Sequence, residues 1–221
     1  MMKTIACVYT GMGGLPEKIE GIFKETLGDI KVRHIADSTL IADIVAKGEI
    51  TDDLKCRIFA LYDAAALGEG DPIISTCSSI GEVTDEYAAA HPDVPIMRID
   101  YPMADYAAQN GKKVVVMATL STTVGPSAGL LRRLAAEKGR EVEIREITVP
   151  GAFAAMVGGD MKKAGELVRA CAAENCKDAD IVLLAQASMS FFKEILREEL
   201  GEDVPLLESP STCAEYLKSR M

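Results

Sequence analysis

Two similar stretches decide the fold: DPIISTCSS at residues 71–79 and DIVLLAQAS at residues 180–188. Each begins with an acidic residue, continues as a short apolar strand, and ends in one polar residue followed by small ones. A short apolar run bounded by turn residues is typical of a strand buried in a parallel sheet. The repetition predicts two related lobes that face one shared pocket. The polar residue is Cys77 in the first stretch and Gln186 in the second, so only one copy carries a thiol.

The same order of elements surrounds each stretch. In the first half, strands are expected at residues 4–9, 31–35 and 72–76, with helices at 16–27, 37–46, 52–67 and 82–90. In the second half, strands are expected at 113–118, 141–147 and 181–185, with helices at 124–138, 161–176 and 191–200. Alternating strands and helices predict parallel sheets, with ligands bound at the carboxyl ends of the strands.

The predicted architecture is an α/β fold of two pseudo-symmetric lobes, each a parallel sheet flanked by helices, with the active site in the cleft between them. The first lobe is expected to contain residues 1–103 and 207–221, and the second residues 104–206. Residues 98–109 form the first crossover in this scheme, and residues 204–208 return to the first lobe. Ser209 then caps a last helix that begins at Pro210.

Composition narrows the class of protein. The chain has 221 residues, of which 48% are hydrophobic, so it is long enough for a full core and is not disordered. The formal net charge is −10 and there is no basic stripe, which argues against nucleic acid and anionic membranes as partners. No apolar run reaches the ~20 residues needed to span a bilayer. Six scattered cysteines and no export signal predict a cytoplasmic protein with reduced thiols.

Four polar loops are expected to converge at the active site. Their candidate substrate-binding residues are Thr10, Gly11, Ser78, Ser79, Thr119, Thr122 and Ser188. They provide hydroxyls, small side chains and backbone N–H groups, which suit a carboxylate bound without a required arginine.

Cys77 is the candidate catalytic residue. The residues Ser79 to Glu82 match a capping box that opens the next helix. A thiol at a helix N-terminus is favoured as the thiolate, so the pattern predicts a lowered pKa for Cys77. The alternative is a buried structural cysteine, because free cysteine is among the most buried residue types.

Other chemistries fit poorly. The glycines from Gly11 to Gly14 would need a small residue at Pro16 to form a dinucleotide fingerprint. A cysteine phosphatase loop would need an arginine where Val83 stands. The two histidines are far apart in the sequence, and the spacing of Cys171 and Cys176 matches no common zinc site. We therefore expect neither a metal nor a bound cofactor.

At Thr76 to Ser79, at Ala118 to Thr122 and at Asp180 to Ala187, the chain resembles the aspartate/glutamate/hydantoin racemase superfamily. The resemblance covers nearly the whole chain in strand and loop order. It implies two pseudo-symmetric lobes, the first completed by the C-terminus, with one cysteine from each lobe flanking the substrate α-carbon. It also implies a cofactor-independent enzyme, a small carboxylate substrate and a homodimer.

The chain departs from this family at one catalytic position. The first cysteine corresponds to Cys77, whereas the second falls on Gln186, whose amide neither gives nor takes a proton near neutral pH. A carbon next to a carboxylate is a very weak acid, so its proton must leave to a positioned base, and inversion needs an acid on the opposite face. Some relatives, notably arylmalonate decarboxylases, use one cysteine, although theirs lies in the other lobe.

Three hypotheses follow. The first is a one-thiol enzyme that acts on a small carboxylate by decarboxylation, proton transfer or isomerisation, with Cys77 as the acid, base or nucleophile and Gln186 as a polar orienter. The second is an amino-acid or hydantoin racemase or epimerase whose second acid is Cys213. The third is a non-catalytic carboxylate-binding protein. Met189, Phe191 and Phe192 either wall the pocket or pack the following helix.

Overall fold

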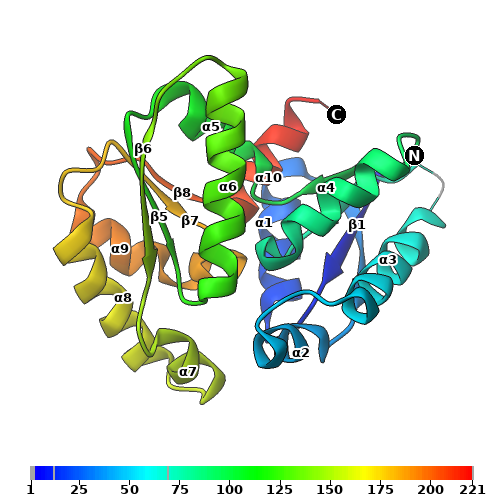
Figure 1. Cartoon of the computed structure of the whole chain (residues 1–221), viewed down its shortest axis with the longest axis horizontal. Helices are drawn as coiled ribbons and strands as arrows, with labels where there is room; N and C mark the ends of the chain where they lie inside the picture. Colours follow the sequence, from blue (N-terminus) through cyan, green and yellow to red (C-terminus); the bar gives the residue numbers. More distant parts are fainter. Residues whose placement is uncertain (1–2, 12, 69, 221) are drawn as a thin grey trace. The chain divides into compact units, whose positions relative to one another are not determined.

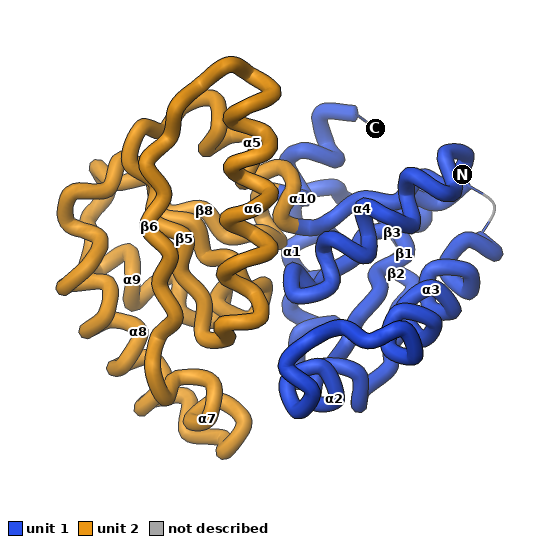
Figure 2. Tube along the Cα trace, in the orientation of Figure 1, with its two compact units in different colours: residues 1–99, 213–221 blue, residues 100–212 orange. Residues whose placement is uncertain are grey.

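The computed structural model describes residues 3–11, 13–68 and 70–220. The chain divides into two compact units, residues 1–99 with 213–221 and residues 100–212, which Figure 2 shows in different colours. Each unit contains a four-stranded parallel sheet, so the predicted α/β fold with two related lobes is confirmed.

The first unit follows the expected order closely. Its elements are β1 (Lys3–Tyr9), α1 (Leu15–Leu27), β2 (Ile30–Ala36), α2 (Leu40–Lys47), α3 (Asp52–Ala66), β3 (Ile73–Ser75), a 3₁₀ turn (Ser78–Ile80), α4 (Gly81–Ala90) and β4 (Ile96–Arg98). The strands lie in the order β2-β1-β3-β4. Figure 1 shows this unit in blue to green, with α2, α3 and α4 labelled.

The alternation of side chains along β1 divides the first unit's core between the two faces of the sheet. Ala6 and Val8 pack with apolar residues of α2, α3 and α4. Cys7 and Tyr9 point to the other face and pack with α1 and with the end of the last helix, including Cys213. Because both faces of β1 are buried, almost all of its residues are apolar.

The second unit repeats this arrangement. Its elements are α5 (Tyr101–Asn110), β5 (Lys113–Ala118), α6 (Ser121–Glu137), β6 (Glu143–Thr148), α7 (Ala152–Val157), α8 (Met161–Asn175), β7 (Ile181–Leu184), a 3₁₀ segment (Ala187–Phe192), α9 (Lys193–Leu200) and β8 (Leu206–Glu208). The strand order β6-β5-β7-β8 is equivalent to the order β2-β1-β3-β4 of the first sheet. One core cluster contains residues from the strands and from the helices that flank them.

The course of the chain near the C-terminus differs from the expectation. Residues 204–208 were expected to return to the first lobe, but β8 pairs with β7 in the second sheet, with Glu208 opposite Leu184. The return is made instead by α10 (Ser209–Lys218), whose Cys213, Ala214 and Leu217 pack in the first unit's core. The reason is that the apolar strand β7 offers its open edge to the apolar residues of β8.

Residues near the first crossover also belong elsewhere than expected. Residues 100–103 open α5, and Met103 lies in the second unit's core. The start of α10 is not capped by Ser209, because its Oγ makes no hydrogen bond within the described chain. The Glu208 carboxylate accepts the N–H of Ser211 instead, at 3.2 and 3.3 Å.

Candidate active site

Cys77 directly follows β3, where Thr76 fixes the end of the strand. The N–H and the Oγ1 of Thr76 both donate to the carbonyl of Val8, at 3.0 and 2.8 Å. The chain then turns, and the N–H of Ile80 donates to the carbonyl of Cys77. The thiol is therefore held in a tight turn at the carboxyl end of the first unit's sheet, where parallel sheets place ligands.

The residue Cys77 is partly exposed as a whole, but its sulfur is buried and has several hydrogen-bond donors around it. Burial raises the pKa of Cys77 above its usual range. Hydrogen bonds from the Thr10 hydroxyl, from the N–H and hydroxyl of Ser79 and from the N–H of Ile80 act in the opposite direction. Removal of the thiolate charge from water outweighs these donors, so the net direction of the pKa shift is upward, and the same donors would stabilise a thiolate once it forms.

The expected capping box and lowered pKa are therefore both wrong. Ser79 lies inside the 3₁₀ turn, and α4 begins only at Gly81, with Ile80 at its N-cap and no side-chain cap. A helix dipole acts mainly within the first turn of its helix. Because α4 begins four residues after Cys77, its dipole does not dominate the pKa of that thiol.

The loop after β1 is held from the side of α2. Thr10 is buried, and its carbonyl accepts the N–H of Ile41 at 2.9 Å. A Cβ at Gly11 would lie 3.1 Å from Cγ2 of Ile41, so the chain passes close to α2 here. Met12, in the glycine-rich run, lies outside the described residues.

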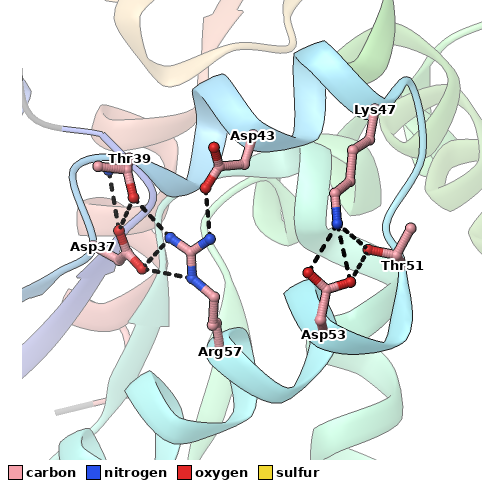
Figure 3. Close-up of polar contacts among 7 residues, drawn as sticks. All are labelled: Asp37, Thr39, Asp43, Lys47, Thr51, Asp53 and Arg57. Carbon is pink, nitrogen blue, oxygen red and sulfur yellow. Dashed lines mark hydrogen bonds and ion pairs between the residues drawn. The ribbon is translucent and has the colours of Figure 1, made fainter.

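A charged network holds α2 to α3 next to this loop (Figure 3). The carboxylate of Asp37 accepts from the N–H and Oγ1 of Thr39 and from Nε and Nη2 of Arg57, whose Nη1 reaches Asp43 at 2.6 Å. The N–H of Asp37 donates to the carbonyl of Tyr9 at 3.1 Å. The network thus ties the loop after β2 to the end of β1.

A second network joins Lys47 to Asp53, which is also bonded to Thr51. All of these charges are paired on the surface of α2 and α3, so we assign the network a structural role.

A triangle of buried hydroxyls lies behind the Cys77 turn and was not predicted. Oη of Tyr62 lies 2.9 Å from Oγ of Ser75 and 2.7 Å from Oγ1 of Thr84, and these two are 3.0 Å apart. Thr84 Oγ1 also lies 3.1 Å from the Ile80 carbonyl. Ser75 is the one polar residue in β3, and this was the only sequence signal for the triangle.

The two candidate serines next to Cys77 differ. Ser79 hydrogen-bonds to the thiol. Ser78 is buried, and its Oγ makes no hydrogen bond to any described residue. A buried hydroxyl without a partner is costly, and a ligand oxygen beside Cys77 would satisfy it.

In the second unit, Gln186 joins the ends of two strands. Its Oε1 accepts from the N–H and the Oγ1 of Thr119, at 3.2 and 2.8 Å, and its Nε2 donates to Oγ of Ser188 at 2.8 Å. These bonds bring three predicted site residues together. An amide nitrogen has two N–H donors, so one remains for a ligand among the contacts described.

The same hydrogen-bonding arrangement occurs at both strand ends, but its acceptor is a thiol in the first unit and an amide in the second. Thr10 donates to the thiol of Cys77 just as Thr119 donates to the amide of Gln186, and each pair is 67 residues apart. The backbone agrees, because Thr76 N–H bonds to Val8 and Ala185 N–H bonds to Met117 at equivalent places. Gln186 therefore occupies the place in the second unit that Cys77 occupies in the first.

The remaining candidate residues differ in their burial and in the core in which they pack. Thr122 is half-buried in the first turn of α6, which starts three residues earlier than expected. Met189 and Phe192 are buried in the second unit's core, whereas Phe191 is 38% exposed. Cys213 is fully buried in the first unit's core. Apolar packing is the role that this position supports.

No group of three histidine, cysteine or acidic side chains is placed to hold a metal ion among residues 3–11, 13–68 and 70–220. Within the same residues, no helix combines the length and hydropathy that a membrane span requires.

Comparison with known proteins decides the family. The model of the Asp/Glu/Hydantoin racemase family matches residues 28–217, which include both strand ends that carry Cys77 and Gln186. The chain belongs to the Asp/Glu/hydantoin racemase family. No curated protein matches it by sequence.

Solved structures of racemases share the fold. Glutamate racemase RacE1 from Bacillus anthracis has a TM-score of 0.78 and 16% identity, with 99% of this chain and 81% of that chain covered. Aspartate racemase from Picrophilus torridus has a TM-score of 0.70 and 17% identity, with 99% and 94% covered. Allantoin racemase from Klebsiella pneumoniae has a TM-score of 0.60 and 12% identity, with 98% and 86% covered.

Proposed function

We propose that this member of the racemase family is a cofactor-independent enzyme that transfers a proton to the carbon next to a carboxylate, with Cys77 as its single catalytic thiol. The observation that carries the proposal is the chemical difference between the side chains that follow β3 and β7. A thiol surrounded by four donors follows β3, whereas an amide already bonded to Thr119 and Ser188 follows β7.

The protonation state of Cys77 favours a role as acid. Burial raises the pKa of its thiol, and a bound carboxylate anion would raise it further. Cys77 therefore enters the reaction with its proton. When the proton leaves, the donors from Thr10, Ser79 and Ile80 receive the negative sulfur.

A thiol that acts first as an acid needs a carbanion made without a base, and decarboxylation of a malonate-type substrate provides one. The bond from the α-carbon to one carboxylate breaks, carbon dioxide leaves, and the electron pair remains as an enediolate. The S–H bond of Cys77 then breaks as a C–H bond forms, which gives a monocarboxylate. Water finally returns a proton to the sulfur. The chemistry balances without a metal or redox partner.

The other polar groups would bind substrate oxygens. The Oγ of Ser78 is buried without a partner in the described chain, which supports a role as donor to the carboxylate or enediolate. We propose the same role for Ser188, Thr119, Thr122 and Ser79, with Thr10 and Gly11 shaping the loop beside the thiol. Gln186 would orient a substrate oxygen through its second amide N–H.

Racemisation is the second candidate, and the family match favours it. It requires a proton donor on the face opposite Cys77. Cys213 is a weak candidate for that donor because it is fully buried among apolar residues. The solved structures with this fold are racemases of glutamate, aspartate and allantoin, which supports a small polar substrate.

The test is proton NMR in deuterated water with pooled amino acids, hydroxy acids, malonates and hydantoins. The wild-type chain is compared with Cys77→Ser, and Cys56→Ser is the matched control because Cys56 is an exposed thiol away from the site. Decarboxylated product that carries one deuterium, lost only in Cys77→Ser, is the expected result. General acid catalysis contributes about 10²–10⁴-fold, so the loss should be at least a hundredfold.

Other outcomes have definite meanings. Deuterium uptake with inversion of a chiral substrate would establish the racemase candidate. Thermal stabilisation by a pooled carboxylate, with no turnover in any variant, would establish a carboxylate-binding protein and overturn the proposed reaction.

A further inference from the structure

Arg98 places a buried cation beside the turn that carries Cys77. It is the last residue of β4, is 3% exposed and lies opposite Ser75 in the sheet. The next residue, Ile99, donates its N–H to the carbonyl of Ser75 at 2.9 Å. A buried guanidinium gives up its hydration, so the groups packed around it determine how it acts on its surroundings.

Gly81 makes room for this cation. A Cβ at Gly81 would lie 2.5 Å from Nη2 and 2.6 Å from Nε of Arg98, and closer still to Cζ. The flat face of the guanidinium thus covers the backbone at Gly81. The glycine has an ordinary helical conformation, with φ −59°, so it is needed for space and not for backbone freedom. Its N–H donates to the carbonyl of Ser78, within the Cys77 turn.

Charged and titratable groups reach the turn from α4 and α3, and a further carboxylate follows Arg98 along the chain. Nη1 of Arg98 lies 3.4 Å from Oδ2 of Asp85 in α4. Tyr62 of α3 reaches Ser75 and Thr84 through its hydroxyl, and both Cys77 and Arg98 act electrostatically on it with opposite signs. Asp100, two residues beyond Arg98, accepts a hydrogen bond from Ser127.

The second unit reverses the charge at the equivalent place. Glu208 ends β8, is 2% exposed and lies opposite Leu184, just as Arg98 lies opposite Ser75. Its Oε1 is 3.6 Å from Nζ of Lys193 in α9. The strand beside β3, which leads to the thiol, therefore ends in the buried cation Arg98. The strand beside β7, which leads to the amide, ends in the buried carboxylate Glu208.

We propose that Arg98 is a positioning residue for Cys77: its guanidinium, held flat against Gly81, fixes the turn and stabilises the thiolate that remains when the thiol loses its proton. Its catalytic consequence rests on the proposed function. Its effect on the thiol exists without substrate, so the two can be tested separately.

The test is alkylation of Cys77 by iodoacetamide as a function of pH, followed by mass spectrometry of the peptide that contains it. An opposite charge nearby lowers a thiol pKa by about one unit or more. We expect Arg98→Met to raise the midpoint by about one pH unit, and Arg98→Lys to restore most of the shift. Asp85→Asn, which removes the counter-charge, should lower the midpoint.

Gly81→Ala gives an independent variant that keeps the charge. Its added methyl group displaces the guanidinium from the turn, so the midpoint should rise as it does in Arg98→Met. If Arg98→Met does not fold, Gly81→Ala and Asp85→Asn decide the question, because their predicted shifts have opposite signs. General loosening of the turn would move both midpoints in the same direction.

Arg33 provides the matched control. Its guanidinium packs on a glycine beside an aspartate in the same way, because a Cβ at Gly68 would lie 2.6 Å from Cζ of Arg33 and from Oδ2 of Asp71. Those residues precede β3, whereas Cys77 follows it. Arg33→Met should leave the Cys77 midpoint unchanged. Unchanged midpoints in folded Arg98→Met and Asp85→Asn would overturn the proposal, and absence of turnover in the wild-type chain would overturn only the proposed function.

Discussion

Thr119 Oγ1 donates a 2.8 Å hydrogen bond to Oε1 of Gln186, in the position where Thr10 of the first unit donates to the thiol of Cys77. The two strand ends thus preserve one arrangement of threonine and partner while the partner changes from a proton-carrying group to an amide. Proton transfer can occur at one of these ends and hydrogen bonding at both.

Removal of the Gln186 amide should destabilise the second unit. In Gln186→Ala the N–H and hydroxyl of buried Thr119 lose their acceptor. Unpaired buried donors cost about 1–3 kcal/mol, so the free energy of unfolding in urea should fall by that amount. Ser188→Ala, which removes one bond from a partly exposed side chain, should cost less than about 1 kcal/mol. Equal losses in the two variants would contradict this account.

A thiol introduced at the second strand end should add inversion. In Gln186→Cys the new sulfur would lie at the γ position of residue 186, the equivalent of the sulfur of Cys77 in the first unit. We expect deuterium uptake with racemisation of a chiral substrate that the wild-type chain protonates on one face only. Chiral chromatography of the product measures this, and Gln186→Ser serves as the control without a thiol.

Alkylation of Cys77 should require alkaline pH. Because burial raises the thiol pKa, the thiolate fraction is small near neutral pH and grows only above the usual cysteine range. Labelling of exposed Cys56 in the same chain shows that the reagent is active at each pH. Extensive labelling of Cys77 at neutral pH would show that the four donors outweigh burial.

Ser78→Ala should separate stability from binding. The hydroxyl is buried without a partner among the described residues, so its removal should leave the free energy of unfolding unchanged or raise it by up to about 1 kcal/mol. If the hydroxyl binds a carboxylate, KM should rise about tenfold, the value of one hydrogen bond to a charged group. Ser209→Ala removes another buried, unpartnered hydroxyl and should leave KM unchanged.

Cys213 should matter for packing and not for proton transfer. Cys213→Ala should keep full activity, because the side chain lies inside the first unit's core. Cys213→Ser places a hydroxyl there, and the free energy of unfolding should fall by about 1–3 kcal/mol. Loss of deuterium exchange in the folded alanine variant would instead make Cys213 the second acid.

The sequence predicted the strand ends well because each follows a run of apolar residues that a parallel sheet buries on both faces. β1, β3, β5 and β7 lie within one or two residues of expectation. Three of the missed elements are short: β4 and β8 have three residues each and α7 has six, too few for a periodic pattern. The ten-residue helix α5 was also missed, because residues 98–109 were expected only as a crossover.

The sequence did not predict which strand β8 pairs with, nor the direction of the Cys77 pKa shift. Residues 204–208 were expected only as a segment that returns to the first lobe, and the pairing of β8 with β7 places them in the second sheet. The sign of the Cys77 pKa shift was predicted wrongly, because the sequence shows the nearby turn but not the burial of the sulfur.

By itself, then, the sequence determined two repeated parallel sheets with a thiol after one strand and an amide after the other. Tertiary structure decided that burial raises the pKa of the thiol, that a hydroxyl triangle lies behind its turn, and that Arg98 lies flat on Gly81. The physical reason is that strand formation depends on neighbouring residues. Desolvation and charge interactions depend instead on distances between segments far apart in the chain.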